Sequence, residues 1–389
     1  TEKIRVGVIF GGRSSEHEVS LKSASCVLKA IDRTKYEVIP IGISKTGQWL
    51  VGNDVLALLS SLAPGLMQGE EQSSYPKEAL PVSLLPVPGT GGLVSLESDQ
   101  GGMEVSSLAS RLDVVFPVLH GTYGEDGAIQ GLMELADLPY VGCGITGSAV
   151  AMDKAMTKAV LTAGDFPQLP YLVVLRSQWE KDPAMVEREV KNHLGYPCFV
   201  KPASLGSSVG ISKARNSAEL QPALAEAAIY DRKLVIEKDA GNAREIECSV
   251  LGNDDPIASV PGEIVPSREF YDYVAKYHDG DSQLIIPARI SPKATRKVQE
   301  LAIGAFKALD CVGMARVDFF VDKTTEQVYI NEINTIPGFT PISMYPKLWE
   351  ASGIPYGELI DRLIELAMEH HRDKQRNVTS FSPKEMKQP

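Results

Sequence analysis

The ten residues YINEINTIPG, at positions 329–338, combine an apolar run with two polar residues, Glu332 and Asn334. Their apolar residues predict a buried strand. Glu332 and Asn334 stand two positions apart, however, so on a strand both side chains point to the same face. A carboxylate and an amide are costly to bury unless each has a polar partner. The stretch therefore predicts that this strand end holds a polar or charged group.

The segment just before it supplies a third oxygen donor. MARVDFFVD, at 314–322, predicts a strand that a short polar turn joins to QVYINEIN, which favours an antiparallel hairpin. The hairpin places Asp318 beside Glu332 and Asn334. Carboxylate and amide oxygens are ligands that Mg²⁺ takes. Spacing alone leaves a plainer interpretation open, in which Asp318 pairs with Arg316 and Glu332 with a lysine.

Length and composition bound the class of protein. The 389 residues predict two or three domains, and the composition is that of an ordinary globular chain, with 43% hydrophobic and 23% charged residues. The net charge of −11 argues against nucleic acid as the main partner. We expect no membrane span, no signal peptide and a cytoplasmic location, with the five dispersed cysteines reduced.

Strand and helix patterns divide the chain. KIRVGVIFGG, SEHEVSLKSASCVLKAI and YEVIPIGI predict a strand, a helix and a second strand, an order typical of a parallel sheet covered by helices. Residues 1–122 are therefore expected to form an α/β domain, in which 60–110 is an insertion of loops and weak strands. The rest predicts α+β structure in two parts, 123–236 and 237–371, and a flexible tail at 372–389.

A Gly/Ser-rich loop follows a lysine in KPASLGSSVGIS, at 201–212. Such loops present backbone N–H groups and hydroxyls to phosphate oxygens. The loop is not a Walker A motif, because GxxxxGK[ST] is absent and a strand, not a helix, is expected after it. A flexible hairpin turn remains the alternative interpretation.

Two further strand ends carry polar residues. VIEK ends in Glu237 and Lys238, where a strand edge could bind an adenine, although a surface ion pair is the stronger interpretation of this segment alone. His120 begins HGTYGEDG after an apolar strand, a usual place for a functional loop. A capping histidine with a structural role fits equally well.

Seven segments in order resemble the D-alanine–D-alanine ligases of the ATP-grasp superfamily, from residue 4 to about residue 370. These segments are VIFGGRSSEHEVSL, VLHGTYGEDGAIQG, MDKAMTK, FVKPASLGSSVG, FYDYVAKY, MARVDFF and INEINTIPGFT. The resemblance implies an ATP-grasp fold behind an N-terminal parallel-sheet domain. It makes 123–236 the central ATP-grasp subdomain, which carries the glycine-rich lid, and 237–371 the C-terminal subdomain, which carries the metal site.

The resemblance also implies an activity: ATP-dependent joining of two D-alanines through a D-alanyl phosphate, for peptidoglycan precursors. The expected cofactors are ATP as a substrate and two Mg²⁺ or Mn²⁺ ions, and a monovalent cation is left open. The expected metal ligands are Asp318, Glu332 and Asn334. The expected ATP contacts are Lys154, Lys201, Ser207, Ser208, Glu237, Lys238 and Glu245.

Residues around the two D-alanines follow from the same resemblance. Glu16 matches the residue that orients the first D-alanine, together with a Ser207–Tyr277 contact, and His120 lies near that substrate. Arg316 and the Gly338 N–H match donors to the tetrahedral oxyanion. The remaining substrate contacts would be Lys276 and Tyr277 from a closing loop, and Ser343 with the Met344 backbone on the second substrate's carboxylate. The lids would span 203–209 and 266–285.

Three alternatives stay open. D-lactate or D-serine could replace the second D-alanine, although Tyr277 in AKY favours the dipeptide. Leu205 stands where a polar residue is expected, which changes the lid surface without a clear effect on chemistry. If the chain were a nucleotide-binding protein without ligase activity, a metal ligand or Arg316 should be replaced, and the sequence keeps all of them. A dinucleotide oxidoreductase is disfavoured because GVIFGG does not fit GxGxxG. The expected partners are small molecules and a second copy of the chain.

Overall fold

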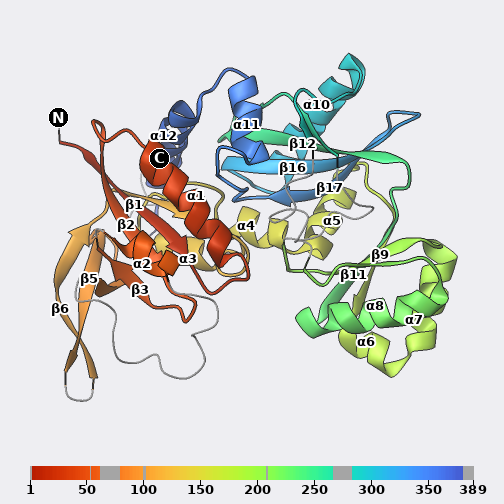
Figure 1. Ribbon diagram of the computed structural model, residues 1–389, viewed down its shortest axis with the longest axis horizontal. Coiled ribbons are helices and arrows are strands. Elements are labelled where there is room, and N and C mark those ends of the chain that lie inside the picture. The colour runs from red at the N-terminus through yellow and green to blue at the C-terminus, as the bar shows by residue number, and fades with distance from the viewer. Residues whose placement is uncertain are drawn as a thin grey trace, which may run out of the picture.

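The computed structural model describes residues 2–52, 54–61, 79–99, 102–206, 209–265 and 283–379. Three β-sheets organise these residues (Figure 1). The first sheet lies at one end of the molecule and a small four-stranded sheet at the other, with the third sheet between them. The expected mixture of α/β and α+β structure is confirmed.

The first sheet has seven strands in the order β6-β5-β4-β3-β2-β1-β7. Only β1 (Ile4–Gly11), β2 (Tyr36–Ile43) and β7 (Val114–Val118) run parallel, as expected for that part of the chain. The other four strands pair antiparallel and extend the sheet; β4 to β6 come from the described part of the predicted insertion. They are β3 (Trp49–Val51), β4 (Leu80–Leu84), β5 (Gly92–Asp99) and β6 (Gly102–Arg111).

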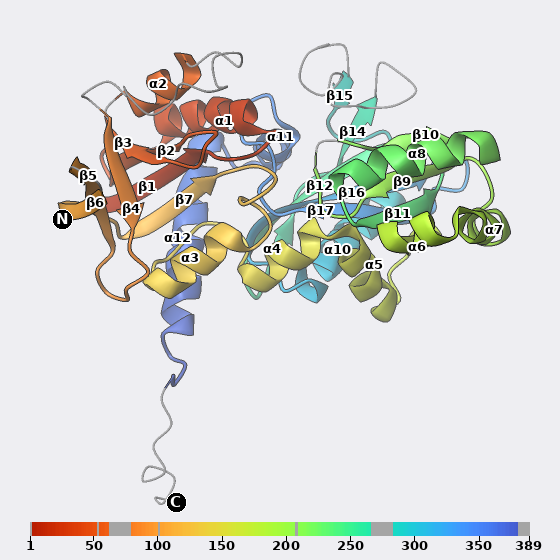
Figure 2. The same cartoon turned by 90° about the horizontal axis from the view of Figure 1, so that it is seen from below.

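Helices cover both faces of this sheet because its parallel strands are apolar on both sides. Val8 and Phe10 pack in one core with α1 (His17–Ala30) and α12 (Tyr356–Lys374). Ile9 packs in the opposite core with α3 (Ala128–Ala136). The helix α12 therefore returns from the end of the described chain to the first sheet, where Figure 2 shows it running behind β1 and β7.

The four-stranded sheet is antiparallel, in the order β10-β9-β11-β8. An apolar core lies between it and two helices, α7 and α8. Its elements are β8 (Tyr171–Leu175), β9 (Cys198–Pro202), β10 (Ser212–Ala214), β11 (Lys233–Lys238), α6 (Arg176–Lys181), α7 (Pro183–His193) and α8 (Ser217–Tyr230).

The third sheet is antiparallel, in the order β15-β14-β12-β16-β17, with β13 on β12. One face packs on α10 (Pro292–Ala308). Its strands are β12 (Ala243–Gly252), β13 (Ile257–Ala258), β14 (Gly262–Val265), β15 (Gln283–Ile285), β16 (Gly313–Asp322) and β17 (Val328–Asn334). The remaining helices of the described residues are α2 (Val55–Ser61), α4 (Ile145–Met152), α5 (Lys154–Ala163) and α11 (Met344–Ala351). The predicted hairpin is confirmed as β16 and β17.

The domain limits at 122, 236 and 371 remain predictions. Every helix in the described part of the chain is too short or too polar to span a lipid bilayer.

Candidate active site

The hairpin of β16 and β17 aims its polar side chains at one face of the third sheet. Along β16 buried residues alternate with less buried ones, and Arg316 and Asp318 fall on the less buried face. Asp318 lies opposite Glu332, and Arg316 lies opposite Asn334. The prediction that Glu332 and Asn334 share a face with Asp318 is therefore confirmed, and it follows from the two-residue period of a strand.

A β-bulge adds a fourth polar residue that the sequence did not reveal. The register shifts between Asp318 and Phe319, so that Phe319 pairs with Ile330 and leaves Asn331 as the extra residue. The Lys201 Nζ lies 3.4 Å from the Asn331 Oδ1. An insertion of this kind keeps both neighbours of the bulge in the ladder while turning one more side chain toward the site. In the sequence, the only sign of this bulge is that two polar residues stand next to each other at 331–332.

Arg316 is the charged centre of this face. Its Nε and Nη2 each lie 2.7 Å from an oxygen of Asp318, and its Nε lies 2.9 Å from the Glu247 Oε2. Burial alone would lower the pKa of Arg316, but the neighbouring carboxylates raise it well above its ordinary value. The guanidinium therefore stays charged, and Glu247 is a site residue absent from the sequence predictions.

The plainer interpretation of the carboxylates is also confirmed. Asp318 pairs with Arg316, and the Glu332 Oε2 lies 3.5 Å from the Lys154 Nζ. Asn334 adds a hydrogen bond from its Nδ2 to Asp318, at 2.9 Å. The predicted metal ligands are thus brought together, and in this structure basic side chains balance both carboxylates.

These residues fit a hard divalent cation by the chemistry of their donors. Within the described ranges no group of three or more His, Cys, Asp or Glu side chains is placed to hold a metal ion. Asp318, Glu332 and Asn334 instead offer two carboxylates and one amide, all oxygen donors, on paired strands. A site with so few protein ligands suits Mg²⁺, which keeps several waters and takes the rest of its shell from substrate phosphates.

A cavity of about 600 Å³ opens beside this face, between the third sheet and the four-stranded sheet. Its lining brings together six of the predicted residues from both sheets, Lys201, Glu237, Lys238, Glu245, Asp318 and Glu332. Basic and acidic groups thus meet across one cleft, as a nucleotide with bound cations requires. The cavity is the strongest structural support for the predicted ATP site.

A buried ionic cluster lies at the floor of the cavity. Lys201 donates to Glu237 at 2.5 Å, and Lys158 donates to the other oxygen of the same carboxylate. Burial would raise the pKa of Glu237, but Lys201 and Lys158 hold it below its usual range. Burial lowers the pKa of Lys158, which is 2% exposed. Lys158 was not predicted, although its position four residues after Lys154 places both lysines on one helix face.

Lys154 lies between the two sheets. It is the first residue of α5, and its Nζ donates to the Leu205 carbonyl oxygen at 2.7 Å. The same Nζ faces Glu332, so one lysine contacts the glycine-rich loop and the predicted metal site. The contact uses the backbone of Leu205, so its apolar side chain does not prevent it.

Glu16 lies between the loop after β7 and the glycine-rich loop. A Cβ placed on Gly121 would lie 2.6 Å from the Glu16 Oε2, and one on Gly206 would lie 3.2 Å from it. The carboxylate therefore lies against both the loop after β7 and the glycine-rich loop. Glu16 is 7% exposed, so its carboxylate is available only within this junction.

His120 is buried beside the same junction. Its Nδ1 lies 3.0 Å from the Ile336 carbonyl oxygen, and its Nε2 lies 3.1 Å from the Ser23 Oγ. A carbonyl can only accept, so Nδ1 carries the proton and Nε2 accepts from Ser23. Burial lowers the pKa of His120, which agrees with a neutral ring. Both the structural and the functional interpretations of His120 remain compatible with this position.

The segment after β17 brings the remaining described residues together. A Cβ on Gly338 would lie 3.1 Å from the Ser343 Oγ, so Gly338 and Ser343 are neighbours. Ser343 is the N-cap of α11, and Met344 is its first residue. Backbone N–H groups at a helix N-terminus suit a carboxylate. Ser207, Ser208, Lys276 and Tyr277, with most of the predicted second lid, lie outside the described residues.

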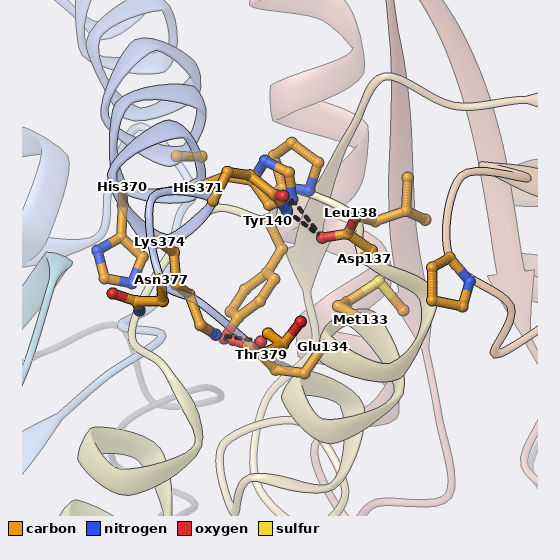
Figure 3. A pocket seen from close by; sticks show the side chains of 14 residues that line it. Met133, Glu134, Asp137, Leu138, Tyr140, His370, His371, Lys374, Asn377 and Thr379 are labelled. Carbon is orange, nitrogen blue, oxygen red and sulfur yellow. Dashed lines mark hydrogen bonds and ion pairs between the residues drawn. The ribbon is translucent and has the colours of Figure 1, made fainter. Parts of the chain in front are cut away.

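Another cavity, of about 520 Å³, lies between α3 and the end of α12 (Figure 3). Its charged side chains pair with one another, Lys374 with Glu134 and His371 with Asp137 at 3.0 Å. None of the predicted site residues lines it. These pairs fasten α12 to α3, so we assign this region to the packing of the fold.

Comparison with known proteins agrees with this geometry. The profile "D-ala D-ala ligase N-terminus" matches residues 5–143, and "D-ala D-ala ligase C-terminus" matches 160–365. A D-alanine–D-alanine ligase of Heliobacterium modesticaldum is 54% identical over 382 residues, which are 98% of this chain and 99% of that protein. One of Geobacillus thermodenitrificans is 48% identical, over 97% of this chain and 99% of that protein.

Solved structures give the same result. The D-alanine–D-alanine ligase of Coxiella burnetii aligns with a TM-score of 0.80 at 38% identity, over 97% of both chains. The VanG D-Ala:D-Ser ligase of Enterococcus faecalis aligns with a TM-score of 0.80 at 34% identity, over 94% of this chain and 100% of that one. The predicted resemblance is confirmed, and the chain belongs to the D-alanine–D-alanine ligase family.

Proposed function

We propose that this protein joins two D-alanines into D-alanyl-D-alanine, with ATP converted to ADP and phosphate, as a step in making peptidoglycan precursors. The observation that carries the proposal is the cleft in which Lys201 and Glu237 of the small sheet face Asp318 and Glu332 of the third sheet. The enzyme class rests on the family to which the chain belongs.

The first half of the reaction has to activate a carboxylate, which is a poor acylating agent. Lys201 and Lys154 would bind the ATP phosphates, and Asp318, Glu332 and Asn334 would hold two Mg²⁺ or Mn²⁺ ions. When bound, such ions offset the negative charge of a phosphoryl group during transfer. Glu16 would orient the ammonium of the first D-alanine so that its carboxylate faces the γ-phosphate.

The second half makes the peptide bond. The amine of the second D-alanine, held through its carboxylate by Ser343 and the Met344 amide, would attack the acyl carbon. Arg316 and the Gly338 N–H would then stabilise the oxyanion, while phosphate leaves. Since acyl phosphates hydrolyse, the glycine-rich loop would also have to exclude water.

The acceptor decides between two versions of this function. A D-Ala:D-Ser ligase aligns along 94% of this chain, so D-serine is a second candidate acceptor. The protein should be supplied with ATP, D-alanine and one of D-alanine, D-serine or D-lactate, and the products identified by mass. We expect D-alanyl-D-alanine as the main product; D-alanyl-D-serine in excess would establish the second candidate.

Replacing Glu332 by glutamine tests the metal assignment. The change keeps the side-chain shape but removes the charge, so the site should bind Mg²⁺ more weakly. Loss of a metal ligand's charge should lower activity at limiting Mg²⁺ by roughly 10- to 100-fold, comparable with the effect of mutating outer-shell partners of metal ligands. Activity measured across a Mg²⁺ titration should recover at high concentration.

Glu358→Gln is the matched control, because Glu358 is exposed on α12 and pairs only locally with Arg362 in the described contacts. Both variants should keep the wild-type Tm within a few degrees. Equal Mg²⁺ dependence in Glu332→Gln and wild type would remove Glu332 from the metal site.

We also propose that the protein acts on small molecules as a homodimer in the cytoplasm, on the basis of its family and composition.

A further inference from the structure

Glu125 links two loops that belong to different parts of the site. It lies between β7 and α3, and its carboxyl group accepts the Gly121 N–H at 2.7 Å and the Ile336 N–H at 3.0 Å, one on each oxygen. Gly121 is in the loop that lies against Glu16, whereas Ile336 follows β17. One side chain thus connects two backbone segments that are far apart in the sequence, since Glu125 and Ile336 are separated by 211 positions.

Ile336 is held from both sides by this loop. Its N–H is donated to Glu125, and its carbonyl oxygen accepts from His120 at 3.0 Å. Ser23 extends the contact, because its Oγ accepts the Phe339 N–H at 3.4 Å and bonds the other nitrogen of His120. The loop after β7 and helix α1 therefore hold the segment 336–339 through its backbone.

That segment includes Gly338, whose amide the proposed function uses as an oxyanion donor. A donor of this kind must be fixed in advance, because a misplacement of about 1 Å can cost roughly 100-fold in rate. Gly338 has no side chain that could anchor it. The backbone hydrogen bonds of its neighbours Ile336 and Phe339 therefore set the position of its amide.

We propose that Glu125 is a positioning residue for the ligation step. By holding the Gly121 and Ile336 amides on one carboxyl group, it fixes the Gly338 amide relative to the loop that lies against Glu16. This inference rests on the proposed ligase function for its catalytic consequence. In this role the carboxyl group acts through its hydrogen bond to the backbone of Ile336.

The chain offers a close control. Asp126, the next residue, also accepts two backbone N–H groups, from Tyr123 at 2.8 Å and Ala128 at 3.0 Å, but both lie within three positions of it. Asp126→Asn therefore disturbs the same kind of bond without touching the segment after β17. Glu125→Gln keeps the length and one acceptor oxygen, whereas Glu125→Ala removes both acceptors.

Three quantities should be measured on each variant: kcat for dipeptide formation, KM for ATP, and hydrogen exchange at the Ile336 amide. We expect kcat to fall about 10-fold in Glu125→Gln and about 100-fold in Glu125→Ala, the scale of a misplaced catalytic group. KM for ATP should stay within about twofold, because Glu125 does not line the nucleotide cleft. Exchange at Ile336 should accelerate in both variants and stay unchanged in Asp126→Asn.

The proposal is overturned if folded Glu125→Gln has the kcat of Asp126→Asn, or if Ile336 exchanges at the wild-type rate. It is also overturned if KM for ATP rises as much as kcat falls. Should Glu125→Ala fail to fold, Glu125→Gln alone decides the outcome. Exchange needs no substrate, so loss of the Ile336 contact can be judged even if wild type makes no dipeptide, a result that would refute the proposed function instead.

Discussion

Replacing Arg316 by lysine should lower kcat by about 100- to 1000-fold, the usual cost of removing one oxyanion donor. Lysine keeps a positive charge between Asp318 and Glu247, so both carboxylates retain a cation beside them. It cannot reproduce the two parallel bonds that the guanidinium makes to Asp318, each 2.7 Å long. We therefore expect a folded protein whose chemistry is impaired, measured by steady-state dipeptide formation.

Arg362→Lys is the control for this change. Arg362 also donates two bonds to a carboxylate, both to the Oε1 of Glu358, but on the exposed face of α12. Its kcat should stay within about twofold of wild type, since exposed pairs contribute little to stability. If Arg316→Lys also retained wild-type kcat, Arg316 could not be a donor to the oxyanion.

Replacing Lys201 by methionine should reduce kcat/KM for ATP by roughly 100-fold. The change removes the proposed charge pair between Lys201 and an ATP phosphate. Truncating one partner of such a pair costs about 2 to 5 kcal/mol of binding free energy, and each 1.4 kcal/mol is tenfold in an equilibrium constant. Lys201 is 8% exposed and bonded to Glu237, which Lys158 continues to neutralise after the change. The fold should therefore survive while phosphate binding suffers, as ATP titrations of initial rate would show.

Lys35→Met provides the comparison, because Lys35 is an exposed lysine that pairs with Asp361 at 2.6 Å. Its kcat/KM for ATP should match wild type. A Lys201→Met enzyme with unchanged ATP dependence would mean that the nucleotide binds elsewhere, and the 600 Å³ cavity would lose its assignment.

The parts of the site that the sequence predicted are those set by local rules. The two-residue period of a strand was enough to place Glu332 and Asn334 on one face, and a short polar turn was enough to pair them with Asp318. The order of strands and helices likewise predicted the three parallel strands that begin the first sheet. The functional roles of these residues came from the family resemblance, because residue spacing alone does not assign them.

The missed residues depend on contacts between distant segments. Asn331 enters the site through a bulge, which no periodic pattern reveals. Glu247 is significant only because β12 lies beside β16 and brings it to Arg316. Glu125 bonds an amide 211 positions away. Lys158 was the one omission that local reasoning could have found, from its helical spacing to Lys154.

Selective use of D-alanine tests the account most directly. Purified protein should be incubated with ATP and Mg²⁺, with D-alanine, L-alanine or no amino acid, while phosphate release is recorded and products are identified by mass. We expect D-alanine alone to support rapid phosphate release, with one dipeptide formed per phosphate. Equal phosphate release with D-alanine and L-alanine, or none with either, would contradict it.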